Sequence, residues 1–182
     1  MLKPSDLITP DDVRGGDASL GDAIRTHGWP TLGAVRGRVM FMLDNESMAP
    51  TELEGHPSLK GRILFASSAP GDDDAAVAKL NNPIDDAAKI KAALAANMLV
   101  RTRADADTVQ ARSDDTTMRD TALSGGAQFV STDYETPDPR FSPYVVRIPG
   151  GTPARCNPVT APPACRSTDV EDPKLLANAT TR

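Results

Sequence analysis

The chain has 182 residues, enough for one domain with a sizeable core but short of the ~250 residues that a complete β/α barrel usually needs. Its formal net charge of -5 argues against a broad nucleic-acid-binding surface, which requires a basic face with interleaved aromatic side chains. No stretch approaches the roughly eighteen apolar residues of a membrane span, so we expect a soluble protein.

A helical region is expected over residues 9–27, near the start of the chain. Thr9 is a good N-cap and is followed by a proline and two acids, and Ser19 offers a second helix start. Two apolar runs come next, at residues 37–45 and 61–68. Their apolarity is continuous rather than alternating, which is typical of strands that are covered on both faces.

The central part of the chain is expected to alternate helices with strands. The pattern predicts helices over residues 72–79, 85–96 and 107–124, and strands over residues 98–103 and 127–132. A glycine pair ends the last of these helices. Together with the two earlier runs, this gives four strands that alternate with helices, which favours an α/β fold with a parallel sheet.

Irregular chain is expected from Glu135 onward, where proline and glycine dominate, apart from a short extended piece at residues 144–148. We therefore divide the chain into a domain of residues 1–150 and an irregular, Pro-rich tail of residues 151–182 that packs on it. The last dozen residues are predicted to be disordered.

Cys156 and Cys165 are the two cysteines, and both lie in the Pro-rich tail. Their spacing matches no common zinc or thioredoxin pattern. We interpret them as a local disulfide, with two unrelated free thiols as the alternative. A disulfide would imply an oxidising compartment, although no secretory signal is visible at the start of the sequence.

Two of the expected strands end in charged residues. Arg101 and Arg103 occupy alternate positions at the end of one strand, and Asp133 ends a neighbouring strand. Alternate positions of a strand share a face, so the two arginines can converge on one anion. Active sites of parallel α/β proteins are built where the strands end. The pattern therefore predicts an anion site, with phosphate as its ligand.

Six motifs occur in register over most of the chain, and together they are specific although each is weak alone. They are Gly28-Trp29-Pro30-Thr31-Leu32, Arg36-Gly37-Arg38-Val39-Met40-Phe41-Met42-Leu43-Asp44, Val100-Arg101-Thr102-Arg103-Ala104-Asp105-Ala106-Asp107-Thr108, Ser124-Gly125-Gly126-Ala127-Gln128, Ser131-Thr132-Asp133-Tyr134 and Arg155-Cys156-Asn157-Pro158. With them the chain closely resembles the C-terminal half of the calcium-dependent, bacterial phosphoinositide-specific phospholipase C family. More distantly, the end of the last strand is similar to the last barrel strand of glycerophosphodiester phosphodiesterases.

The resemblance implies a TIM-type, phospholipase C-like phosphodiesterase barrel, of which this chain supplies about four β/α units as a partial barrel. It implies cleavage of the glycerol-phosphate bond of phosphatidylinositol-like lipids, with Ca2+ as cofactor and a secreted protein. Phosphoinositides or glycerophosphodiesters would be the substrates. The family carries its catalytic histidines and most calcium ligands in its first half, which has no counterpart here. We therefore expect this chain to be inactive alone.

For such a reaction the chain would supply groups that bind the substrate phosphate and headgroup. Arg101 and Arg103 would offer forked donors to phosphate oxygens or an inositol phosphate. Asp133 would orient an arginine, bind a sugar hydroxyl or touch the metal, and Tyr134 would stack on or hydrogen-bond a polyol ring. The alternative is structural, with the arginines bonded to Asp105, Asp107 or Asp133.

The remaining candidate residues have weaker settings. Asp44 and Asn45 end the first strand and are weak candidates for calcium ligands, with a helix N-cap as the alternative for either. His27 stands at an expected helix end and His56 in an expected exposed loop, so neither is a convincing general base.

Two hypotheses follow for the whole chain. The first is the C-terminal half of a secreted phosphodiesterase, with transient membrane-surface contact and no nucleic-acid partner. The rival is a non-catalytic module that binds an anion or lipid headgroup, or a degenerate homologue. A half barrel has two unpaired sheet edges, so we expect self-association or completion by an N-terminal half. A truncated gene product and one chain of a split barrel both remain open.

Overall fold

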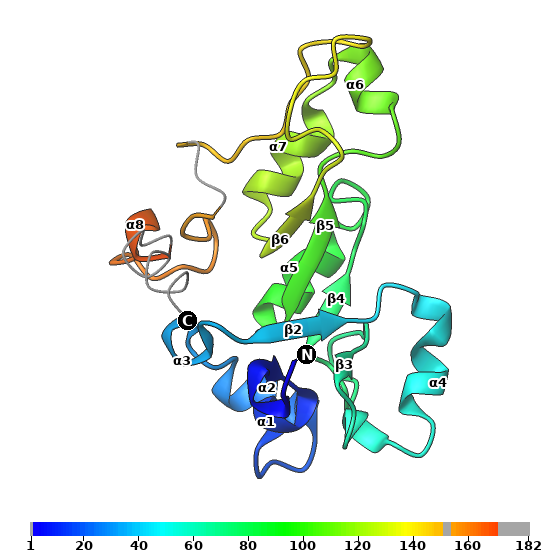
Figure 1. The fold of residues 1–182 in the computed structure, drawn as a ribbon, viewed down its shortest axis with the longest axis vertical. Helices are drawn as coiled ribbons and strands as arrows, with labels where there is room; N and C mark the ends of the chain where they lie inside the picture. Colours follow the sequence, from blue (N-terminus) through cyan, green and yellow to red (C-terminus); the bar gives the residue numbers. More distant parts are fainter. Residues whose placement is uncertain (1, 151–153, 171–182) are drawn as a thin grey trace. The chain divides into compact units, whose positions relative to one another are not determined.

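The structure is a computed structural model that describes residues 2–150 and 154–170, and its helices and short strands confirm the predicted α/β class (Figure 1). The strands are β1 (Leu7–Ile8), β2 (Val39–Met42), β3 (Leu64–Phe65), β4 (Val77–Lys79), β5 (Leu99–Arg103) and β6 (Phe129–Ser131). The α-helices are α1 (Pro10–Arg14), α2 (Leu20–His27), α3 (Leu32–Val35), α4 (Ala49–Leu53), α5 (Ala87–Ala95), α6 (Val109–Ser113), α7 (Thr117–Ser124) and α8 (Ser167–Val170). The 3₁₀ turns are η1 (Pro4–Asp6), η2 (Glu46–Met48) and η3 (Pro57–Leu59).

The chain divides into two compact units, which are described separately. Unit 1 comprises the chain up to Lys79 together with Ala92–Val100. Unit 2 comprises Leu80–Lys91 and the described residues from Arg101 onward. The predicted disorder of the last dozen residues lies outside the described residues.

The strands β1 to β4 of unit 1 lie side by side in chain order. β2 pairs in parallel with β1, where Leu7 is opposite Val39, and with β3 on its other side. Beyond β3, a parallel bridge joins Ser67 to Val77 of β4, with the amide of Ser68 donating to the Val77 carbonyl at 3.0 Å. Sequential parallel neighbours are the arrangement that β-α-β connections produce.

The second sheet has the order β4-β5-β6. Within unit 2 the end of β5 pairs in parallel with β6, with Arg101 opposite Phe129. Side chains of β5 alternate: Val100 and Thr102 are fully buried, while Arg101 and Arg103 are half-buried. The two arginines therefore share one face of the strand, as their spacing predicted.

The helix starts of unit 1 use the capping residues that the sequence indicated. Oγ1 of Thr9 accepts a hydrogen bond from the amide of Asp12 at 3.3 Å, and Oγ of Ser19 accepts one from the amide of Asp22 at 3.0 Å. The predicted helical region is thus two capped helices, α1 and α2. The second ends at Gly28, whose φ of 72° is in the region that glycine tolerates.

The helix predicted over residues 72–79 is wrong, because this segment forms a turn followed by β4. All four residues 75–78 are buried, and three of them are alanines, so the run has no period that separates a buried strand from a helix. β1 was also missed, since it is two residues long. Asp74 before β4 is buried, and burial together with the charges of two neighbouring aspartates raises its pKa.

The single helix predicted over residues 107–124 is two helices, α6 and α7. Asp114 ends α6 in the left-handed conformation, with φ at 54°, which short polar side chains tolerate better than most. The carboxyl of Asp115 then accepts a hydrogen bond from the amide of Thr117 at 2.9 Å, at the start of α7. No strand forms over residues 144–148, where the amide of Val146 bonds to the Tyr134 carbonyl at 2.8 Å.

The strand β2 is not covered on both faces, contrary to the prediction from its continuous apolarity. Val39 and Phe41 are 38% and 40% exposed, whereas the intervening Met40 and the following Met42 are half-buried. Apolarity on both faces of a strand does not by itself say that both faces are covered.

Candidate functional site

Two arginines and an aspartate meet where β5 and β6 end, within unit 2. Nη2 of Arg103 lies 3.9 Å from Oδ2 of Asp133, with the two side chains 32% and 65% exposed. At this distance and exposure the pair is a loose ion pair in contact with solvent. Among the described residues, the Arg103 guanidinium makes no other polar contact than this pair. Most of its N–H donors therefore remain available to a ligand.

Arg101 is held more firmly than Arg103. Its Nη1 donates to Oδ1 of Asn81, which stands just beyond the end of β4. The backbone adds to this anchor, because the amide of Leu80 donates to the Arg101 carbonyl at 2.9 Å. Three successive strand ends, those of β4, β5 and β6, therefore supply Asn81, the arginines and Asp133.

Sequence reasoning did not assign Asn81 to the site. The segment before it was predicted to be helical, so its place after a strand could not be recognised. One feature of the sequence could have indicated this place. The apolar run 75–78 has the length of a short buried strand, and the polar Asn81 follows shortly after it, as at a strand end.

Of the aspartates considered as structural partners of the arginines, Asp133 lies beside Arg103 in the loose ion pair, whereas Asp105 contacts neither arginine. The Asp105 side chain is buried, at 1% exposure. Its carboxyl accepts hydrogen bonds from Oγ1 of Thr132 at 2.5 Å and from the amide of Asp133 at 3.0 Å. It thus ties the end of β5 to the end of β6, beside the loose ion pair.

Tyr134 is buried, at 6% exposure, and packs in a small aromatic cluster. Its ring centroid lies 5.6 Å from that of Tyr144 and 6.5 Å from that of Phe141. Its hydroxyl donates to the carbonyl of Asp107 at 3.1 Å. These contacts give Tyr134 a packing role that supports the loop after β6, and they leave little of its ring open for stacking on a polyol.

In unit 1, Asp44 and Asn45 follow β2 and both are engaged by other groups. The ammonium of Lys79 donates to the Asp44 carbonyl and lies 3.3 Å from Oδ1 of the same residue. Oδ1 of Asn45 accepts the amide of Ser47 at 3.1 Å, which is the N-cap role considered for it. Lys79, whose side chain is 12% exposed at the end of β4, is a strand-end cation that the predicted helix concealed.

Both histidines belong to unit 1, whereas the strand-end arginines belong to unit 2. His27 ends α2 and its Nε2 lies 3.5 Å from Oδ2 of Asp17. Nδ1 of His56 lies 2.7 Å from the carbonyl oxygen of Lys60. Among the described residues, no group of three or more His, Cys, Asp or Glu side chains is arranged to hold a metal ion.

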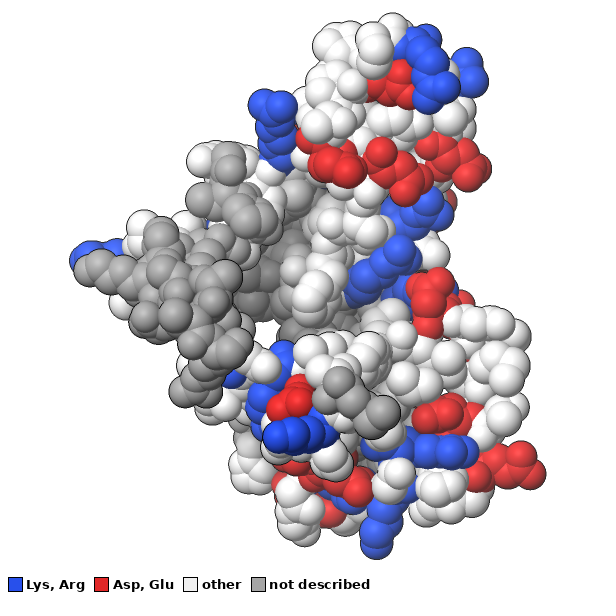
Figure 2. Space-filling model, viewed as in Figure 1, with Lys and Arg blue, Asp and Glu red and all other residues white. Residues whose placement is uncertain are grey.

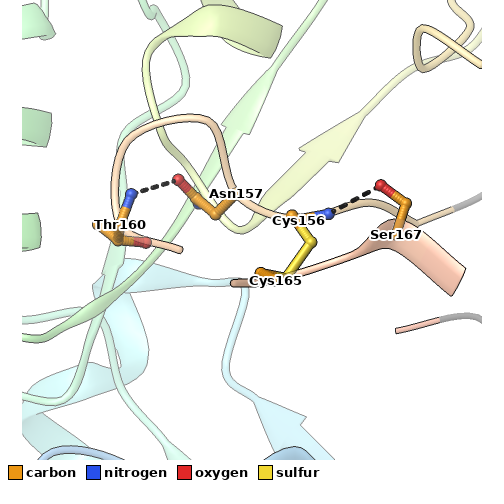
Figure 3. Close-up of a disulfide and its surroundings, with 5 residues drawn as sticks. All are labelled: Cys156, Asn157, Thr160, Cys165 and Ser167. Atoms are coloured by element: carbon orange, nitrogen blue, oxygen red, sulfur yellow. Dashed lines mark hydrogen bonds between the residues drawn. A yellow bond between two sulfur atoms is a disulfide. The ribbon is translucent and has the colours of Figure 1, made fainter. Parts of the chain in front are cut away.

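The tail contains the predicted disulfide between Cys156 and Cys165 (Figure 3). The flanking residues attach this loop to the end of α7. Nη2 of Arg155 donates to the Leu123 carbonyl at 2.6 Å, and the side-chain amide of Asn157 donates to the Gly126 carbonyl at 2.7 Å. A guanidinium on the last carbonyls of a helix also complements the helix dipole.

The surface carries charges of both signs. Figure 2 shows Lys and Arg side chains interspersed with Asp and Glu over the face in view. On this face the positive charges do not form one broad basic patch. Within the described part of the chain, no helix is long and apolar enough to cross a membrane.

The fold and the strand-end arginines define an α/β protein with a candidate phosphate site. The chain belongs to the phosphoinositide phospholipase C, Ca2+-dependent, family, whose model matches residues 1–158. This match supports the resemblance to the C-terminal region of that family. No curated protein and no solved structure matches the chain significantly.

Proposed function

We propose that this chain supplies the phosphate- and headgroup-binding part of a secreted phosphodiesterase that cleaves phosphatidylinositol-like lipids at the glycerol-phosphate bond. The observation that carries the proposal is the pair of Arg103 and Asp133 at the ends of β5 and β6, beside Arg101. Family membership supports the reaction class, and the half-exposed arginine supports the site.

Each residue of the proposed site has a part that its contacts permit. Arg103, with free donors, binds non-bridging phosphate oxygens and stabilises the charge that develops there. Arg101, fixed by Asn81, adds a second positive charge on the same face. Asp133 orients Arg103 and accepts a hydroxyl of the polyol headgroup. Tyr134 supports the loop that follows β6.

Calcium fits this chain poorly as a bound cofactor. The carboxyl of Asp44 is paired with Lys79, and the side-chain oxygen of Asn45 is used as an N-cap. Calcium requires six to eight oxygen ligands, and no acidic cluster of that kind stands among the described residues. The proposal therefore assigns no calcium ligand to this chain, and leaves most ligands to the first half of a complete barrel.

The proposed architecture is a partial β/α barrel of about four units. The parallel, sequential order of β1 to β4 in unit 1 supports it, as does the parallel pair of β5 and β6 in unit 2. Neither histidine belongs to unit 2, which carries the proposed phosphate site, so the proposal assigns no acid or base for the phosphodiester to this chain. The chain is therefore inactive alone.

A cleavage assay on phosphatidylinositol vesicles, with and without calcium, tests this function. The 182-residue chain should release no inositol phosphate above background, whereas a barrel completed with the first half of a family member should. Arg103→Ala in the completed barrel should lower turnover by about 10²-fold. Arg140→Ala is the matched control, because Arg140 is 79% exposed and pairs with Asp138 two residues away.

The rival function is a non-catalytic module that binds an anion or lipid headgroup. It is favoured by the place of both histidines in unit 1, and by the lack, among the described residues, of a group of side chains that could hold a metal ion. A completed barrel that binds inositol phosphate but never cleaves the lipid would favour this rival.

A further inference from the structure

The burial of the Asp105 carboxyl group requires an explanation. It is 1% exposed and stands directly after β5, yet none of the donors that reach it is a cation. A carboxylate removed from water without a positive partner is costly unless several hydrogen bonds satisfy it. The hydrogen-bond donors of the Asp105 carboxyl therefore indicate its role.

Two of these donors belong to consecutive residues at the end of β6. Oγ1 of Thr132 donates to Oδ2 of Asp105 at 2.5 Å, and the amide of Asp133 donates to Oδ1 at 3.0 Å. The same Oγ1 accepts the amide of Tyr134 at 2.9 Å. One carboxyl group thus fixes the backbone on both sides of the Asp133 side chain.

The side chain of Asp133 has few other constraints. It is 65% exposed, and its contact with Arg103 is a loose 3.9 Å ion pair. Such a pair contributes little to holding either partner. The direction in which the Asp133 carboxyl leaves the strand is therefore set mainly by its backbone, and Asp105 holds that backbone.

We propose that Asp105 is a positioning residue, which aims Asp133 at the polyol hydroxyls of the headgroup and keeps it beside Arg103. The inference rests on the proposed function, in which Asp133 accepts a headgroup hydroxyl while the arginines bind the phosphate. Asp105 then governs the preference for an inositol phosphate over phosphate itself, without touching the ligand.

Tyr144 contacts the buried Asp105 carboxyl as well, and its role is structural. It is 1% exposed, and its hydroxyl donates to the Ala104 carbonyl at 3.0 Å and lies 3.4 Å from Oδ2 of Asp105. Burial and the charge of Asp105 raise the pKa of Tyr144, so the hydroxyl keeps its proton. Because Tyr144 has no bond to the end of β6, Tyr144→Phe disturbs the buried network but not the Asp133 backbone.

Calorimetric titration of the 182-residue chain with myo-inositol 1-phosphate and, separately, with inorganic phosphate tests the inference. The wild-type chain should prefer inositol 1-phosphate. Asp105→Asn should weaken inositol 1-phosphate binding on the order of tenfold, the effect of misplacing one charged hydrogen bond, and leave phosphate binding within about twofold. Tyr144→Phe should lower the unfolding temperature and keep the preference.

Three results would overturn it: Asp105→Asn keeps the full preference, it loses both ligands equally, or Tyr144→Phe removes the preference as well. If the wild-type chain binds neither ligand, the proposed function fails and the positioning role fails with it. If Asp105→Asn does not fold, Thr132→Val replaces it and should also reduce the preference, while Thr132→Ser, which keeps the hydroxyl, should retain it. A full preference in Thr132→Val would equally contradict the inference.

Discussion

Replacement of Arg103 by alanine should separate ligand binding from stability. In the folded protein its ion pair with Asp133 spans 3.9 Å and both side chains are in contact with solvent, so losing it should cost only about 0 to 1 kcal/mol of unfolding free energy. Phosphate binding should suffer more, because a hydrogen bond to a charged group contributes about 1.5 to 3 kcal/mol. That corresponds to a roughly ten- to hundredfold rise in the dissociation constant.

The assay is titration with myo-inositol 1-phosphate beside urea unfolding of the same samples. Arg103→Lys should recover part of the affinity, since lysine keeps the charge but loses the forked donors. Arg140→Ala should change neither affinity nor, by more than a few tenths of a kcal/mol, stability. An Arg103→Ala chain that binds as tightly as the wild type, or one that fails to fold, would refute the reading of Arg103 as a functional rather than structural residue.

Three further predictions follow from other parts of the chain. Reduction of the disulfide between Cys156 and Cys165, which are 9 positions apart, should destabilise the chain by about 2 to 3 kcal/mol in the chain-entropy model; two alkylated thiols in protein exported to an oxidising compartment, detected by intact mass, would exclude the bond. Within the described part of the chain β6 pairs with β5 alone, and this edge should make the chain self-associate in light scattering; a monodisperse monomer would show that the edge is protected. Hydrogen bonds from Arg140 lower the pKa of Asp138 from 3.8 to about 2. The pair is in contact with solvent, so its stabilisation should be small; it should be present above pH ~4 and be lost as the pH falls through about 2. Carboxyl NMR of Arg140→Ala should return the Asp138 midpoint to its ordinary range.

Local signals in the sequence predicted the elements that such signals control. Thr9 and Ser19 cap helices where their spacing indicated, and the alternation of β5 places Arg101 and Arg103 on one face. Asn45 also serves as the N-cap that was considered for it. In each case the deciding interaction lies within a few residues in the sequence, so propensity and spacing were sufficient.

The errors come from interactions that are distant in the sequence. The run of residues 75–78, which leads into β4, consists of three alanines and a valine that are all buried, and only its spatial neighbours distinguish it from a helix. Asp105 lies in a segment where charged and uncharged residues alternate. Nothing local indicates that its hydrogen-bond donors are 27 and 28 positions away. Tyr134 was expected to contact a polyol ring, and nothing local indicates that the loop after β6 folds back and buries it against Tyr144.

The central claim is that the ends of β5 and β6 bind the phosphate and headgroup of an inositol phosphate. NMR titration of the isotope-labelled 182-residue chain with myo-inositol 1-phosphate tests it most directly, observed at the Arg103 guanidinium and the Asp133 backbone amide. The account predicts saturable shifts at both positions, with the Arg140 guanidinium unchanged. Saturation without shifts at Arg103 and Asp133, or no binding at all, would contradict it.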